Sequence, residues 1–102
     1  MVNRSYRIGY NFERRVIKYL EKQGYLVIRS GKSKFPDFMA YRKEDKIPIV
    51  GECKVNKYIS REEKEKANDI YRKTNVPLTV YYREGKKLKS WVYGPSVKLE
   101  SS

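Results

Sequence analysis

The sequence contains no histidine and only one cysteine, Cys53. The absence of histidine excludes Ser-His-Asp and Cys-His catalysis, histidine general bases and most zinc sites. A lone cysteine excludes an internal disulfide and a cysteine zinc cluster, and it suits a reducing cytoplasm. Any catalysis by this chain must therefore depend on carboxylates, lysine, tyrosine or a hard metal ion.

Long apolar runs are also missing. No run approaches the roughly 20 residues of a transmembrane helix, and the first residues lack the apolar core of a signal peptide. We therefore expect a cytoplasmic protein. The 102 residues are enough for one domain, 1–102, with a modest core over about 8–93 and short polar tails.

Acidic residues are scarce relative to basic ones. The chain has 24 Lys and Arg against 12 Asp and Glu, which gives a formal net charge of +12. A charge of this size on a small domain raises self-repulsion and favours a polyanionic partner. Nucleic acid is the first candidate and an anionic membrane surface is the second. The lack of a strongly amphipathic basic helix argues against the membrane.

Apolar spacing predicts two helices. The first covers residues 11–23, with Asn11 as its N-cap. The second covers 60–73, because Ser60 and Glu63 have the spacing of a capping box.

Five short β-branched or aromatic segments predict strands at 25–30, 37–42, 47–55, 77–83 and 87–93. The first three are close enough in sequence to form an antiparallel meander, and a tight turn joins the last two. The order αβββαββ predicts a mixed α/β fold, with a central mixed five-stranded sheet flanked by helices.

Three charged residues, Asp37, Glu52 and Lys54, stand at the ends of apolar segments. Side chains alternate along a strand, so Glu52 and Lys54 share a face. Counting from the turn at 43–46 places Asp37 beside Glu52 at the open end of the hairpin. Two carboxylates this close repel each other and favour protonation, a conflict that a divalent cation removes. Oxygen ligands alone favour Mg²⁺, with Mn²⁺ as a substitute.

A hard cation on a basic surface suits phosphodiester hydrolysis, because it polarises the phosphate and lowers the pKa of bound water. Lys54 would hold the attacking hydroxide or stabilise charge on the transition state. Glu13 borders the buried face of the first helix and can reach the same site. Each of these residues, taken singly, also has an ordinary structural role as an alternative to catalysis. Asp37 could cap a strand, Glu52 and Lys54 could form a surface ion pair, and Glu13 could lie on a solvated helix face.

The segments "PD" at 36–37 and "ECK" at 52–54 match the Pro-Asp…(Asp/Glu)-x-Lys nuclease superfamily. The run "GYNFERRVIKYLEKQGYLVIRSGKSKFPDFMAY" resembles the opening of archaeal-type Holliday junction resolvases. The resemblance covers roughly residues 8–93. It implies a restriction-endonuclease-like core and Mg²⁺-dependent cutting of four-way DNA junctions. It also implies a homodimer, since two sites related by a two-fold axis suit a symmetric cut.

The resemblance assigns roles by position. The implied catalytic residues are Glu13, Asp37, Glu52, Lys54 and Ser33, with Glu13, Asp37 and Glu52 as metal ligands. Arg14 and Arg29 match positions that contact phosphates. Together with them, the expected DNA-binding residues are Ser30, Lys32, Lys34 and Lys57.

Two alternatives remain open at this point. A different nuclease of the superfamily, acting on flaps, single strands or specific sequences, would share every motif residue. A non-catalytic basic DNA-binding module would bind the same DNA without metal-dependent cutting.

Overall fold

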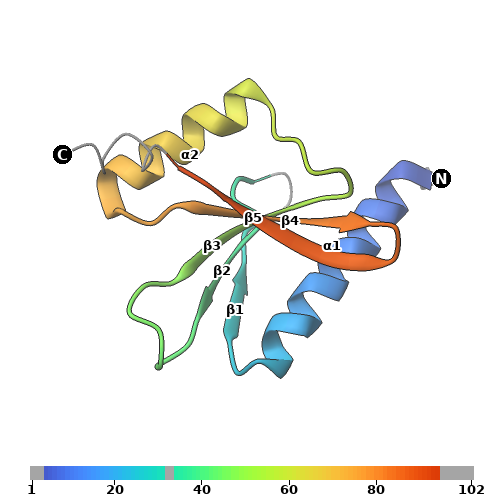
Figure 1. Cartoon of the computed structure of the whole chain (residues 1–102), viewed down its shortest axis with the longest axis horizontal. Helices are drawn as coiled ribbons and strands as arrows, with labels where there is room; N and C mark the ends of the chain where they lie inside the picture. Colours follow the sequence, from blue (N-terminus) through green and yellow to red (C-terminus); the bar gives the residue numbers. More distant parts are fainter. Residues whose placement is uncertain (1–3, 32–33, 95–102) are drawn as a thin grey trace.

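The computed structural model describes residues 4–31 and 34–94. Along the chain lie α1 (Arg4–Lys22), β1 (Leu26–Arg29), β2 (Phe38–Tyr41), β3 (Ile49–Lys54), α2 (Arg61–Thr74), β4 (Leu78–Glu84) and β5 (Lys87–Tyr93) (Figure 1). The predicted order αβββαββ and the mixed α/β class are confirmed.

The five strands form one sheet in the order β1-β2-β3-β4-β5. The first three pair antiparallel, as the predicted meander requires, and β4 pairs antiparallel with β5. Only β3 and β4 are parallel. Parallel neighbours need a long crossover connection, and α2 supplies it. The two helices lie on opposite sides of the sheet (Figure 1).

Helix α1 begins at Arg4, so the prediction of Asn11 as its N-cap is wrong. Ile8 precedes Phe12 by one helical turn and continues the apolar spacing past Asn11. This continuation outweighs the modest helix-interior penalty of an asparagine. The helix ends at Lys22, and Gly24 follows it with a φ of +94°. Glycine adopts this conformation without strain, as is usual just after a helix.

Each face of the sheet has its own core. The α1 side buries Phe12, Val16, Leu20, Phe38, Ala40 and Tyr81. The α2 side buries Val50, Ile59, Ala67, Val76, Leu78 and Val80. Strand alternation divides β3 between the cores, because Ile49 packs on the α1 side and Val50 on the α2 side. Both faces of β3 are thus packed against a core. This packing holds in place the strand that carries Glu52 and Lys54.

The predicted capping box opens α2. The Ser60 hydroxyl accepts a hydrogen bond from the Glu63 N–H, and the Glu63 carboxylate accepts one from the Ser60 N–H. At the other end, Asn75 takes a left-handed conformation with φ 64°, and its N–H donates to the Tyr71 carbonyl.

Gly51 lies opposite Phe38 in the β2–β3 pair, and a Cβ at this position would overlap the Phe38 ring. Phe38 is fully buried, so its ring can give way only by displacing the core residues around it. We therefore expect Gly51→Ala to lower the free energy of unfolding by about 1–3 kcal/mol, measured by urea denaturation. Gly9→Ala is the control, because a Cβ there meets nothing within 4 Å. It should leave stability unchanged or raise it slightly. Equal urea midpoints for Gly51→Ala and the wild type would contradict this packing.

Within residues 4–31 and 34–94, no helix is both long enough and apolar enough to cross a membrane.

Candidate active site

Asp37 and Glu52 meet at the open end of the β2–β3 hairpin. The register pairs Phe38 with Gly51, so the next step brings Asp37 opposite Glu52. The Asp37 N–H donates to Glu52 Oε1 at 3.1 Å, and Asp37 Oδ2 accepts from the Cys53 N–H at 2.7 Å. The two carboxyl groups are therefore neighbours, as the count from the turn predicts.

The two acids share a desolvated environment. Glu52 is only 6% exposed. Burial, followed by the coulombic effect of Asp37, raises the pKa of Glu52 to about 8. The pKa of Asp37 is raised to about 6, chiefly by burial; the hydrogen bond from the Cys53 N–H opposes this rise and the charge of Glu13 contributes to it. Asp37 thus ionises first, and its negative charge then disfavours ionisation of Glu52.

This donor set fits a hard divalent cation. Two adjacent carboxylates that disfavour each other's ionisation are relieved by a positive charge between them. Mg²⁺ typically binds one or two carboxylates and fills its other positions with water and substrate phosphate. Within the described parts of the chain, no three carboxylate or thiol side chains form a ready-made metal cluster. Asp37 and Glu52 are the pair that the structure brings together.

Lys54 lies beside this pair. Its Nζ is 3.9 Å from Glu52 Oε2, as expected for two residues on one face of a strand. Its closer partner is Glu63, with Nζ 2.6 Å from Glu63 Oε2. Sequence reasoning assigned Glu63 only to the capping box and missed this contact. The sequence offered one indication of this contact. The segment between β3 and α2 is short, so the first turn of α2 must lie near the end of β3.

Glu13 and Arg29 reach the same end of the sheet from the α1 side. Arg29 ends β1 opposite Phe38, and its Nε lies 3.4 Å from Glu13 Oε2. Glu13 is near enough to Asp37 for its charge to raise the pKa of Asp37. Its role as a metal ligand stays a prediction, because in this structure its carboxylate pairs with Arg29.

The remaining predicted DNA-binding residues are spread around this end. Arg14 is exposed on α1 and donates to the Tyr10 hydroxyl at 3.2 Å. The Ser30 N–H donates to the Asp37 carbonyl at 2.9 Å. Lys34 and Lys57 have exposed side chains. Lys32 and Ser33 lie outside the described residues.

Cys53 lies between Glu52 and Lys54 in the motif. Its side chain is partly buried against the α1-side core, and desolvation raises the pKa of its thiol above the ordinary range of a cysteine. A thiol that stays protonated is not a nucleophile. The side chain is a small apolar packing group between the two charged residues of the motif.

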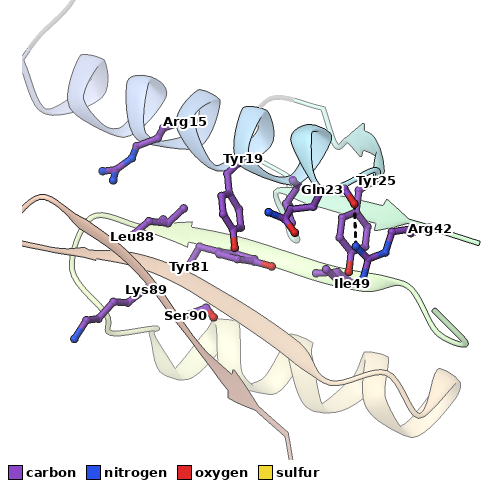
Figure 2. Close-up of a pocket in the computed structure, with 11 residues that line it drawn as sticks. Arg15, Tyr19, Gln23, Tyr25, Arg42, Ile49, Tyr81, Leu88, Lys89 and Ser90 are labelled. Carbon is purple, nitrogen blue, oxygen red and sulfur yellow. Dashed lines mark hydrogen bonds between the residues drawn. The ribbon is translucent and has the colours of Figure 1, made fainter. Parts of the chain in front are cut away.

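A cavity of about 450 Å³ lies between α1 and the sheet (Figure 2). It is lined by Arg15, Tyr19, Leu20, Gln23, Tyr25, Arg42, Ile49, Tyr81, Leu88, Lys89 and Ser90. Beside it the Tyr25 hydroxyl donates to Asp45 Oδ2 at 2.6 Å, and the Arg42 guanidinium lies 4.3 Å from the centre of the Tyr25 ring. None of the residues of the Asp37–Glu52–Lys54 group lines it. This cavity is therefore separate from the candidate active site.

A mixed five-stranded sheet with an aspartate directly before β2 and a Glu-x-Lys at the end of β3 defines the Pro-Asp…(Asp/Glu)-x-Lys nuclease class. A family model described as archaeal Holliday junction resolvase (Hjc) matches residues 4–100, and the chain belongs to this family.

Known proteins similar to this chain include two that carry the name Hjc. The crossover junction endodeoxyribonuclease Hjc of Methanocaldococcus jannaschii is 42% identical over 66 residues, which cover 61% of this chain and 48% of the relative. The chain thus spans about half the length of that curated relative. The structure of Archaeoglobus fulgidus Hjc, described as a Holliday junction resolvase, matches with a TM-score of 0.68 at 22% identity. That match covers 82% of this chain and 76% of the other, and it confirms the fold.

Proposed function

We propose that this protein is a structure-selective endonuclease that hydrolyses phosphodiesters of four-way (Holliday) DNA junctions with Mg²⁺. The observation that carries the proposal is the opposed Asp37–Glu52 pair with Lys54 beside it at one end of the sheet. Membership in the junction-resolvase family supports the substrate class. The net charge of +12 suits a polyanionic substrate.

Each residue has a distinct part in this proposal. The carboxylates of Asp37 and Glu52 would hold the cation, which would supply charge stabilisation and a more acidic water. Metal dependence is general in nucleases of this family, and a donor set of carboxylate oxygens favours Mg²⁺ over softer ions. The Lys54 ammonium, 3.9 Å from Glu52, is placed to stabilise negative charge that develops on the phosphate.

Recognition in this proposal depends on the shape of the DNA. Arg14, Lys34 and Lys57 are exposed and would contact phosphates, and phosphate contacts carry no sequence information. A four-way junction presents two equivalent strands to be cut. A homodimer with two sites related by a two-fold axis would match that symmetry, so dimerisation is part of the proposal. Action on cellular DNA also implies a place in the cytoplasm beside the nucleoid.

The proposal is tested by cleavage of a substrate panel with Mg²⁺. We expect paired, symmetric cuts in a synthetic four-way junction, and little cutting of linear duplex, flap or single-stranded DNA of the same sequences. Chelation of the metal should stop cleavage and leave junction binding in place. Faster cutting of flaps or single strands would assign the chain to another specificity of the same nuclease class. Binding without cutting in Mg²⁺ or Mn²⁺ would identify a non-catalytic DNA-binding module.

A further inference from the structure

Glu63 uses both of its carboxylate oxygens. Oε2 accepts a charge-assisted hydrogen bond from Lys54 Nζ at 2.6 Å, and Oε1 accepts the Ser60 N–H at 2.8 Å. The Ser60 hydroxyl in turn accepts the Glu63 N–H at 3.1 Å. The capping box of α2 therefore fixes the carboxylate that holds the lysine of the Glu-x-Lys motif.

Without Glu63, the nearest carboxyl group to Lys54 would be that of Glu52. The present distance of 3.9 Å from Lys54 Nζ to Glu52 Oε2 is too long for a hydrogen bond, but a small rotation of the flexible lysine stem would close it. Such a bond would occupy an oxygen of Glu52 that the cation needs. Charge-assisted bonds of the Lys54–Glu63 length are among the strong ones, so the observed pairing keeps the ammonium beside the acids without neutralising them.

We infer that Glu63 is a positioning residue, which holds Lys54 in place for the reaction and keeps it from pairing with Glu52. This inference rests on the proposed function, in which Lys54 acts on the phosphate. It adds a residue of α2 to a site that the sequence motif confines to β2 and β3. The capping box then has two roles: it stabilises the start of α2, and it orients the carboxylate that binds Lys54.

The test compares single-turnover junction cleavage by the wild type and Glu63→Gln at saturating DNA. We expect Glu63→Gln to lower the cleavage rate constant about 10–100-fold, the usual effect of removing a group that orients a site residue, with junction affinity unchanged. Glu62→Gln removes the same charge from the same turn of α2 but does not contact Lys54, so it should cut like the wild type. Ser60→Ala removes the hydroxyl that caps the helix but keeps the backbone N–H that holds Glu63 Oε1, so it should lower stability with little loss of rate.

A double-mutant cycle separates positioning from a general loss of charge. In a Lys54→Ala background, Glu63→Gln should have no further effect on the residual rate, because its action passes through Lys54. An equal loss of rate with and without Lys54 would overturn the inference. So would a Glu63→Gln variant with wild-type activity.

A chemical measurement tests the contact even if the wild type cuts none of the DNA substrates. Amine-directed acetylation followed by peptide mass mapping reports how accessible each lysine is as a free amine. In the wild type, Lys54 should react several-fold more slowly than exposed Lys57. Glu63→Gln should raise the Lys54 rate several-fold and leave the Lys57 rate unchanged. If Lys54 reacts equally fast in the wild type and in Glu63→Gln, the contact does not exist in solution and the inference falls.

Discussion

Replacing Asp37 by asparagine or Glu52 by glutamine should abolish junction cleavage and leave junction binding nearly unchanged. Each change keeps the size of the side chain and removes one of the two negative charges that face each other across the β2–β3 pair. A metal ion typically contributes several kcal/mol of transition-state stabilisation, so a loss of about 4 kcal/mol corresponds to a rate reduction of about 10³-fold. Binding depends mainly on the surrounding basic residues and should survive.

The measurement is single-turnover cleavage of a labelled junction, with binding followed by gel shift in the presence of a chelator. Asp69→Asn is a matched control, because Asp69 is an acid of α2 whose partners, Arg72 and Lys73, belong to its own helix. It should cut like the wild type. Wild-type cleavage by either Asp37→Asn or Glu52→Gln would show that the metal site is elsewhere.

The metal-free protein should lose stability as pH rises from about 4 to about 8. Burial raises the pKa of Asp37 to about 6 and that of Glu52 to about 8, whereas both groups ionise near pH 4 in the unfolded chain. The folded state therefore holds more protons than the unfolded state in this window. Its stabilisation is complete below pH 4 and is lost as pH climbs through the two folded pKa values. The total loss should be on the order of a few kcal/mol.

Mg²⁺ should reverse this loss, because binding of a cation to the ionised pair stabilises the folded state and is stronger at higher pH. Thermal melting across this pH range, with a chelator and with Mg²⁺, measures both effects. Glu52→Gln is the informative variant, since it removes the group with the higher pKa. Its melting temperature should fall less with pH, and Mg²⁺ should raise it less. Parallel curves for Glu52→Gln and the wild type would contradict the assignment of these pKa shifts.

Local patterns were sufficient to predict most of the fold. β-branched runs separated by short polar turns determine a meander, so the open end of the second hairpin could be located by counting from residues 43–46. This is why the proximity of Asp37 and Glu52 was predictable. The start of α1 was missed because Asn11 is a favourable N-cap in isolation. In the folded chain, apolar spacing from Ile8 onward continues the helix through it.

The parts that sequence could not supply depend on how distant elements pack. A capping box predicts where α2 starts and says nothing about what the second oxygen of Glu63 contacts. That contact depends on the placement of α2 over the end of β3. The cluster of Tyr25, Arg42 and Asp45 was also not predictable from sequence. Tyr25 directly precedes β1, whereas Arg42 and Asp45 follow β2, and these segments meet only in the folded chain. Helices and strands follow from local periodicity, whereas side-chain pairs between them follow from tertiary packing.

The inert thiol of Cys53 has a practical consequence for single-molecule work. It is the chain's single cysteine, and desolvation raises its pKa, which disfavours the reactive thiolate. A cysteine introduced at an exposed position, such as Lys86 in the β4–β5 turn, would be the preferred target of a maleimide dye without removal of the native residue. Fluorescent protein prepared this way would keep the native residue between Glu52 and Lys54, so its movement on branched DNA could be followed with the motif intact.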